Sequence, residues 1–207
     1  GVSNRLPGGP ANANALNAIQ SGGMGEGWSD WWALMFTQQA SDLAGDARPI
    51  GNYVLGQNQN GPGIRRFPYS FDLAINPQTF SAFNSDPFRE VHNTGELWAA
   101  ALWDMNWLLI NGISTPDCNG NVTPGYGFDP DLYHGTGGNN LALQLVMDGL
   151  KLQPANPSFV QARDAILQAD LINNGGANSD AIWTAFARRG LGFSADAGPD
   201  GNTLTIT

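Results

Sequence analysis

The chain has 207 residues, of which 42% are hydrophobic and 13% are charged, and it carries a formal net charge of -9. The hydrophobic fraction argues against disorder and suffices for one sizeable core, so we expect a single domain over residues 1–207. A nucleic-acid partner is not expected, because phosphate binding needs clustered Lys and Arg, and no apolar run approaches the ~20 residues of a membrane span.

Residue usage indicates a secreted, extracellular protein. Asn, Gly and Trp are frequent, Lys151 is the only lysine, and acidic residues outnumber basic ones by 18 to 9. Cys118 is the only cysteine, which excludes a disulfide within the chain. The opening GVSNRLPGGP shows neither an initiator Met nor a targeting pattern, so we expect the sequence to be a piece of a longer protein.

Two strong helices are predicted in the first half of the chain. Residues 1–23 are rich in Gly, Pro and Asn, although ANANALNAIQ could form a short helix. Residues 25–44 follow with a helical pattern, whose apolar face is formed by Met24, Trp28, Trp31, Trp32 and Met35. Residues 46–70 are broken by Pro and Gly and predict a loop or short strand. A second helix is predicted over about 89–109, with an apolar stripe made by Val91, Trp98, Leu102, Met105 and Leu109.

Three shorter helices are predicted in the second half, at about 139–150, 158–169 and 181–190. The tail DGNTLTIT could form a short strand. There is neither βαβ alternation nor an internal repeat. We therefore predict a mainly α fold with long loops, and a core that includes Trp28, Trp31, Met35, Trp98, Leu102, Leu145 and Ile166.

Two carboxylates lie in register in the stretch SGGMGEGWSDWWALMF. Glu26 and Asp30 are four residues apart and so share a helix face. The ordinary interpretation is a solvated face of an amphipathic helix. The neighbouring apolar residues argue against full solvation, and the glycines around Glu26 would let another segment or a metal approach. If Glu26 is buried, it requires a cation.

The other candidate residues are a histidine and an arginine pair. His92 lies at the start of the second predicted helix, where an inert, hydrogen-bonded histidine is the ordinary interpretation. Arg65 and Arg66 are ordinarily surface residues in ion pairs. His134 has no motif around it, and we assign it no role.

A series of segments, in order along nearly the whole chain, resembles the fungalysin-type (M36) zinc metallopeptidases, which are thermolysin-like gluzincins. The segments are GVSNRLPGGPANANALNAIQSGGMGEGWSDWWA, GIRRFPYS, VHNTGELWAAALW, DGLKLQPANPSFVQARDAILQAD and IWTAFARRGLG. The resemblance implies that the chain is the thermolysin-like C-terminal helical subdomain of such an enzyme, beginning just after its H-E-x-x-H motif.

The resemblance also implies roles for the two carboxylates. Glu26 matches the glutamate zinc ligand of the family. Asp30 matches the aspartate that holds the first zinc-binding histidine, and such partners fix the tautomer and direction of an imidazole. The glycines beside Glu26 would make room for the H-E-x-x-H helix.

Further roles follow from the same resemblance. His92 is similar to the histidine that stabilises the oxyanion of the reaction. Asp86 is our first choice for the carboxylate that orients His92, with Glu90 and Glu96 as alternatives. Arg65, and with less support Tyr69, would line the substrate groove.

The chain has no H-E-x-x-H motif, and His92 and His134 are its only histidines. A catalytic zinc needs three protein ligands and a water, and the glutamate of the motif would be the general base. We therefore expect the missing N-terminal half to supply two ligands and the base, so that this chain alone is inactive. The predicted function is part of a secreted zinc endopeptidase that hydrolyses protein or peptide substrates.

The alternative is a non-catalytic binding or structural protein that retains the peptidase-like fold. Trp and Tyr side chains with scattered carboxylates would suit a carbohydrate. The Asp-rich segment DPDLYHGTGGN also permits calcium as a second metal, since hard oxygen ligands suit it, although its spacing matches no defined loop.

Overall fold

The computed structural model describes residues 1–117 and 119–207, apart from the side chain of Asp86. Cys118 therefore lies outside the described residues. Within this part the chain forms five α-helices joined by long loops, which confirms the predicted mainly α class. The helices are α1 (Ile19–Thr37), α2 (Val91–Asn111), α3 (Gly138–Leu152), α4 (Phe159–Asn174) and α5 (Ser179–Arg188). Short 3-10 helices are η1 (Ser3–Arg5), η2 (Tyr53–Leu55), η3 (Phe80–Asn84) and η4 (Asp86–Phe88).

One small sheet follows directly on α2. Its strands β1 (Gly112–Ile113) and β2 (Thr123–Pro124) are antiparallel, with Gly112 opposite Pro124 and Ile113 opposite Thr123. None of the helices in the described residues is long and apolar enough to cross a bilayer.

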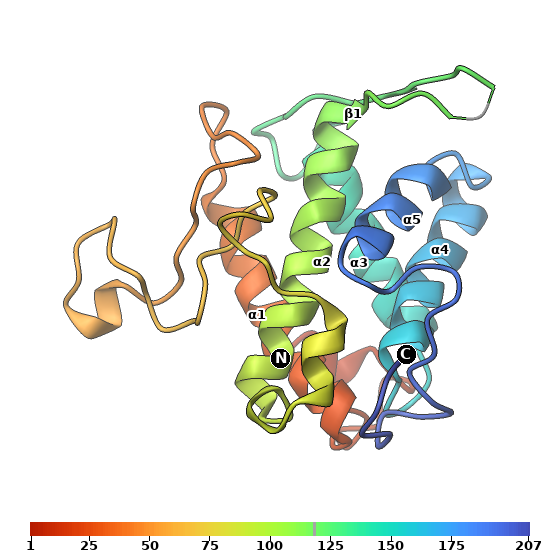
Figure 1. Ribbon diagram of the computed structural model, residues 1–207. Helices are drawn as coiled ribbons and strands as arrows, with labels where there is room; N and C mark the ends of the chain where they lie inside the picture. Colours follow the sequence, from red (N-terminus) through yellow and green to blue (C-terminus); the bar gives the residue numbers. More distant parts are fainter. Residues whose placement is uncertain (118) are drawn as a thin grey trace.

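Helix α2 is the centre of the fold. It runs between α1 on one side and the group of α3, α4 and α5 on the other (Figure 1). Every residue from 94 to 110 is buried, so the helix is covered on all faces rather than on the single stripe that we predicted. A helix surrounded in this way belongs to the core.

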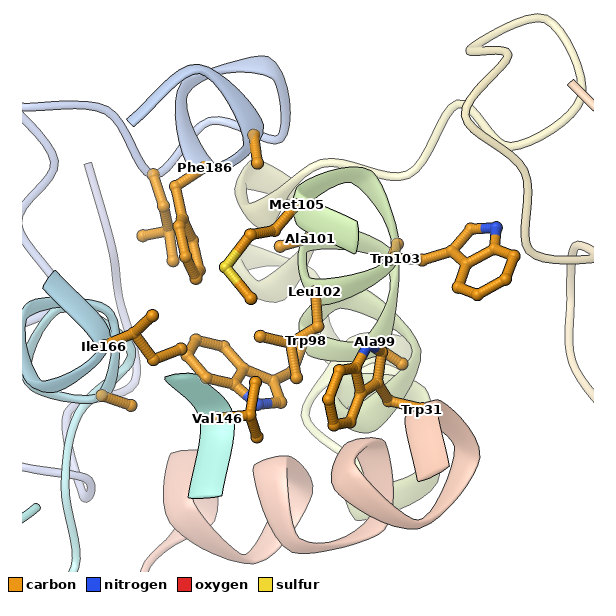
Figure 2. Packing of buried hydrophobic residues seen from close by; sticks show 14 of the residues in the cluster. Trp31, Trp98, Ala99, Ala101, Leu102, Trp103, Met105, Val146, Ile166 and Phe186 are labelled. Atoms are coloured by element: carbon orange, nitrogen blue, oxygen red, sulfur yellow. The ribbon is translucent and has the colours of Figure 1, made fainter. Parts of the chain in front are cut away.

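Trp98 lies at the middle of the core. Its ring packs edge-on against Trp28 at 5.8 Å between centroids, and at a tilt of 44° against Phe186 at 5.6 Å. Figure 2 shows Val146 and Ile166 closing the other sides of the same ring. All seven residues that we predicted for the core are buried. The aromatic contacts therefore join α2 to both neighbouring layers.

Helix α1 begins and ends earlier than predicted, at Ile19 and Thr37 instead of 25 and 44. The glycine-rich segment is thus part of the helix. A Cβ atom at Gly27 would lie only 2.5 Å from the carbonyl oxygen of Gly95, and one at Gly95 only 2.8 Å from the amide nitrogen of Gly27. The backbones of α1 and α2 therefore touch, and this packing outweighs the low helix propensity of glycine. In the observed fold, Gly23 and Gly27 make room for α2. The room that we expected for an H-E-x-x-H helix stays a prediction, because that motif is not in this sequence.

Two weaker predictions are wrong. ANANALNAIQ forms mainly turns before α1 begins, and the tail DGNTLTIT forms no strand. The backbone of Ile206 instead bonds the side chain of Asn84, through Nδ2 to the carbonyl oxygen at 2.8 Å and through the amide to Oδ1 at 2.9 Å. Thr207 exchanges two backbone hydrogen bonds with Asp196, at 2.6 and 2.8 Å, but this single pair does not extend into a strand.

A buried ion pair fastens the chain after α5 to the central helix. Arg189 donates from Nε and Nη2 to the two carboxylate oxygens of Asp104, each at 2.9 Å. Its remaining donors reach backbone oxygens of Ser70, Asn76 and Gln78. Burial raises the pKa of Asp104, and the guanidinium groups of Arg189 and Arg188 oppose this rise. The pair thereby holds the 70–78 loop against α2.

The contact between α1 and α2 is tested by two neighbouring glycines. Gly27→Ala should lower the free energy of unfolding by about 1–3 kcal/mol, because overpacking exceeds the gain in helix propensity. Gly25→Ala is the matched control, since its Cβ would meet only Leu16 Cδ1 at an ordinary 3.6 Å. It should be neutral or stabilise by up to about 1 kcal/mol. Urea unfolding of both variants measures the difference, and equal effects would refute the close contact.

Candidate functional site

Glu26 and His92 lie side by side where α1 crosses the start of α2. Oε2 of Glu26 is 3.5 Å from Nε2 of His92, and the two side chains are 43% and 54% exposed. The glycine contact brings them together, because a Cβ at Gly95, less than one turn after His92, would lie 3.0 Å from Cβ of Glu26. The structure thus places a carboxylate and an imidazole at one accessible point.

Glu90 holds the other face of the imidazole. Its Oε1 lies 2.6 Å from Nδ1 of His92, while its Oε2 accepts the backbone amides of His92 and Asn93 and so caps α2. Burial raises the pKa of Glu90, but its hydrogen bonds with His92 outweigh this and hold the pKa below the usual range. Glu90 was one of our alternatives for this place. The side chain of Asp86, our first choice, lies outside the described residues.

Asp30, not Glu26, is the buried carboxylate that has acquired a cation. Arg65 donates to it from Nε at 2.6 Å and from Nη2 at 2.8 Å, and the hydroxyl of Tyr69 donates at 2.6 Å. Burial lowers the pKa of the Arg65 guanidinium, yet the hydrogen bond and charge of Asp30 more than offset this, so the pKa is raised. Burial, followed by the charge of Asp30, raises the pKa of Tyr69 well above its usual value.

Arg65 and Tyr69 both bond Asp30, and their predicted place along the substrate groove stays a prediction. Tyr69 is 1% exposed, and its hydroxyl points at Asp30 rather than at solvent. The sequence held one usable signal: a carboxylate on an apolar helix requires a cation, and the 46–70 loop region offered Arg48, Arg65 and Arg66 as candidates.

Glu96 does not contact His92, contrary to the remaining alternative. It is buried one turn further along α2, where it accepts hydrogen bonds from Nε2 of Gln78 at 2.6 Å and from the backbone amide of Arg66 at 3.2 Å. Burial raises the pKa of Glu96. This residue is part of the arrangement around Asp30, and we did not predict that part from the sequence.

Of the other sequence candidates, Arg66 borders this site, because its Nε donates to Oδ1 of Asn93, the residue after His92, at 3.2 Å. The exposed guanidinium of Arg66 stacks on the ring of Phe88 at 4.5 Å. His134 is exposed and lies 3.5 Å from Asp131. In the segment that we considered for calcium, carboxylate oxygens of Asp129 and Asp131 accept backbone amides of their own loop, so protein hydrogen bonds organise it.

Comparison with known proteins gives consistent matches. The sequence profile of the Fungalysin metallopeptidase (M36) family matches residues 1–195. The extracellular metalloproteinase mep of Aspergillus fumigatus is 47% identical over 197 residues, which cover 94% of this chain and 29% of the relative. Extracellular metalloproteinase 2 of Phaeosphaeria nodorum is 45% identical over 200 residues, with the same coverage, 94% and 29%. The extracellular metalloproteinase MEP of Leptosphaeria maculans is 42% identical over 208 residues, covering 98% of this chain and 30% of the relative. The chain thus spans less than a third of the length of these curated relatives.

The contact between Tyr69 and Asp30 predicts an alkaline loss of stability. Because the folded-state pKa of Tyr69 is raised, its contribution is complete below about pH 10, the usual tyrosine pKa, and is lost as the pH rises above it. Tyr69→Phe should lower the unfolding free energy at pH 7 by about 1–3 kcal/mol, since Asp30 loses a buried donor. It should also flatten the decline above pH 10. Denaturant unfolding between pH 7 and 11 measures both effects.

The matched control is Tyr133→Phe, because Tyr133 is 92% exposed. This variant should change neither the stability at pH 7 nor the alkaline decline. If the unfolding free energy of Tyr69→Phe fell above pH 10 as steeply as that of the wild type, ionisation of Tyr69 would not be the cause of the alkaline loss of stability.

Proposed function

Since the chain belongs to the fungalysin family of metallopeptidases (M36), we propose that it is part of a secreted zinc endopeptidase in which Glu26 is one zinc ligand. The observation that carries the proposal is the pairing of Glu26 with His92 at 3.5 Å on an accessible surface. The names of the relatives, which describe extracellular metalloproteinases, support secretion and peptide hydrolysis.

The residues present fit a part of a zinc site. The carboxylate of Glu26 is half exposed, and none of the hydrogen bonds found among the described residues uses it, so its oxygen lone pairs are open to a metal. The described residues contain no cluster of three or more His, Cys, Asp or Glu side chains that could hold a metal ion alone. A catalytic zinc takes three protein ligands. We propose that two histidines of an H-E-x-x-H motif outside these 207 residues complete the site, and that the chain alone is inactive.

Asp30 is proposed to orient one of those histidines. A carboxylate has about four acceptor positions, and Arg65 and Tyr69 use three of them. The remaining position can accept an imidazole N–H. Because three donors fix Asp30, it would hold that ring in one direction, which is the usual role of a carboxylate behind a metal-binding histidine. In this proposal Arg65 and Tyr69 act through Asp30, and their expected place along the substrate groove is kept as part of the proposal.

His92 is proposed to donate a hydrogen bond to the substrate. Zinc in such a site polarises the peptide carbonyl and activates a water. Nε2 of His92 lies beside Glu26 and can aim an N–H at the oxygen on which negative charge develops. Glu90 accepts at Nδ1 and keeps the ring in this direction. The substrates would be proteins or peptides.

The role assignment is tested by three variants of the intact protein. Glu26→Gln should lose zinc and activity together, because it removes a charged ligand. Asp30→Asn should weaken zinc affinity by about 10–100-fold. His92→Ala should keep its zinc and lower kcat by about 100–1,000-fold, as for the loss of an oxyanion donor. Metal analysis beside steady-state kinetics measures all three.

The pattern among these variants decides the result. If His92→Ala lost zinc while Glu26→Gln retained it, the two roles would be exchanged. If all three variants were fully active, or if the intact protein hydrolysed no peptide, the non-catalytic binding protein would be the better interpretation.

Glu90 allows the capping and orienting roles to be separated. Asn is as good a helix N-cap as an acidic residue, but it cannot provide a charged acceptor for Nδ1 of His92. Glu90→Asn should therefore preserve stability and zinc content while lowering kcat by about tenfold, as for other groups that fix an imidazole. Full activity of this variant, with the helix cap retained, would show that another group orients His92.

A further inference from the structure

Glu96 is a buried carboxylate, 1% exposed, and the proposed mechanism gives it no part. We propose that Glu96 is a positioning residue, which holds the 65–69 segment in place so that Arg65 and Tyr69 can donate their hydrogen bonds to Asp30. This inference rests on the proposed function of Asp30 as the partner of a zinc-binding histidine. It assigns a specific task to a side chain that does not itself touch Asp30.

Glu96 contacts the segment at a peptide group next to Arg65. Oε1 of Glu96 accepts the backbone amide of Arg66, the residue that directly follows Arg65. Fixing this peptide fixes the position from which the Arg65 side chain starts. At the other end of the segment, Tyr69 exchanges two backbone hydrogen bonds with Arg48, at 2.8 and 2.9 Å. The backbone is thus held directly after the first donor to Asp30, Arg65, and at the second, Tyr69.

The other partner of Glu96, Gln78, is itself held in place by hydrogen bonds. The side-chain amide of Gln78 donates to Oε2 of Glu96. The backbone carbonyl oxygen of Gln78 accepts a hydrogen bond from Nη1 of Arg189 at 3.0 Å. Arg189 is in turn paired with Asp104 in the interior of α2. Glu96 therefore connects the Arg65 segment to the buried Arg189–Asp104 pair.

Burying the Glu96 carboxylate in this arrangement costs free energy. Both direct donors to Glu96 are neutral, and burying a carboxylate without a directly bonded cation is unfavourable. An apolar side chain would fill the same space at lower cost but could not hold the backbone amide of Arg66. The favourable term is the pair of hydrogen bonds that join two loops to one turn of α2.

The test uses the intact protein with Glu96→Ala, Glu96→Gln and a control. Glu96→Ala leaves the amide of Arg66 without its acceptor. Glu96→Gln can restore the contact: its carbonyl accepts that amide, and its NH₂ group can donate to Oε1 of Gln78, a buried atom with no partner among the described residues, once the Gln78 amide turns over. Asn106→Ala is the control, because Asn106 is a fully buried polar residue of the same helix that bonds Gln38 instead.

Two measurements are made beside the unfolding free energy: amide hydrogen exchange of residues 65–69, and zinc affinity by chelator competition. Glu96→Ala should speed exchange in this segment and weaken zinc binding by about tenfold, the lower end for partners behind a metal ligand. Glu96→Gln should stay close to wild type in both. Asn106→Ala should lose stability with no change in either. If Glu96→Ala fails to fold, Gln78→Ala, which removes one of the donors to Glu96, should still speed exchange.

The proposal is overturned if neither Glu96→Ala nor Gln78→Ala alters exchange in the segment, or if Asn106→Ala changes exchange and zinc affinity as much as Glu96→Ala does. An intact wild-type protein without zinc would instead refute the proposed function. The exchange measurement would then still decide whether Glu96 holds the segment.

Discussion

The fold and its site depend on the direct backbone contact between α1 and α2. Gly27 and Gly95 leave no space for a Cβ atom between the two helices. This closeness sets the distance between Glu26 and His92, which belong to different helices and come from positions far apart in the sequence. It also lets Trp28 reach Trp98, so the same contact organises the core. Larger residues at the crossing would separate the two functional side chains and loosen the aromatic packing together.

Much of this fold could be predicted from apolar periodicity. The spacing of Trp28, Trp31 and Met35 identified a buried helix face, and all three are buried. The start of α1 could not be predicted in this way, because glycine is a poor helix former and its use here depends on a partner helix distant in the sequence. The complete burial of residues 94–110 was missed for a related reason: periodicity reveals one face of a helix, whereas the number of neighbouring layers is a tertiary property.

The candidate site, too, could be predicted from the sequence only in part. Glu26, Asp30 and His92 could be selected from the sequence because their residue types and spacings match a known family. Their surroundings could not. Both carboxylates of α1 looked alike in the sequence, yet Asp30 is buried and accepts three hydrogen bonds, while Glu26 is half exposed. That difference arises from a loop 35 residues further along the chain, whose path no local pattern records. The half-exposed carboxylate is the one suited to a metal, and the buried one, held by three donors and with one acceptor position left, is suited to orient a neighbouring imidazole.

The burial of α2 also limits where this protein can be redesigned. Residues 94–110 are all buried, so a substitution that changes the size or shape of one side chain there requires several neighbouring side chains to repack. The first turn, which carries Glu90 and His92, is exposed and faces no such demand. Side chains in the loops that face this turn can therefore change without repacking the core, whereas residues 94–110 form a rigid support for Glu90 and His92, the two residues that the proposed mechanism needs unchanged.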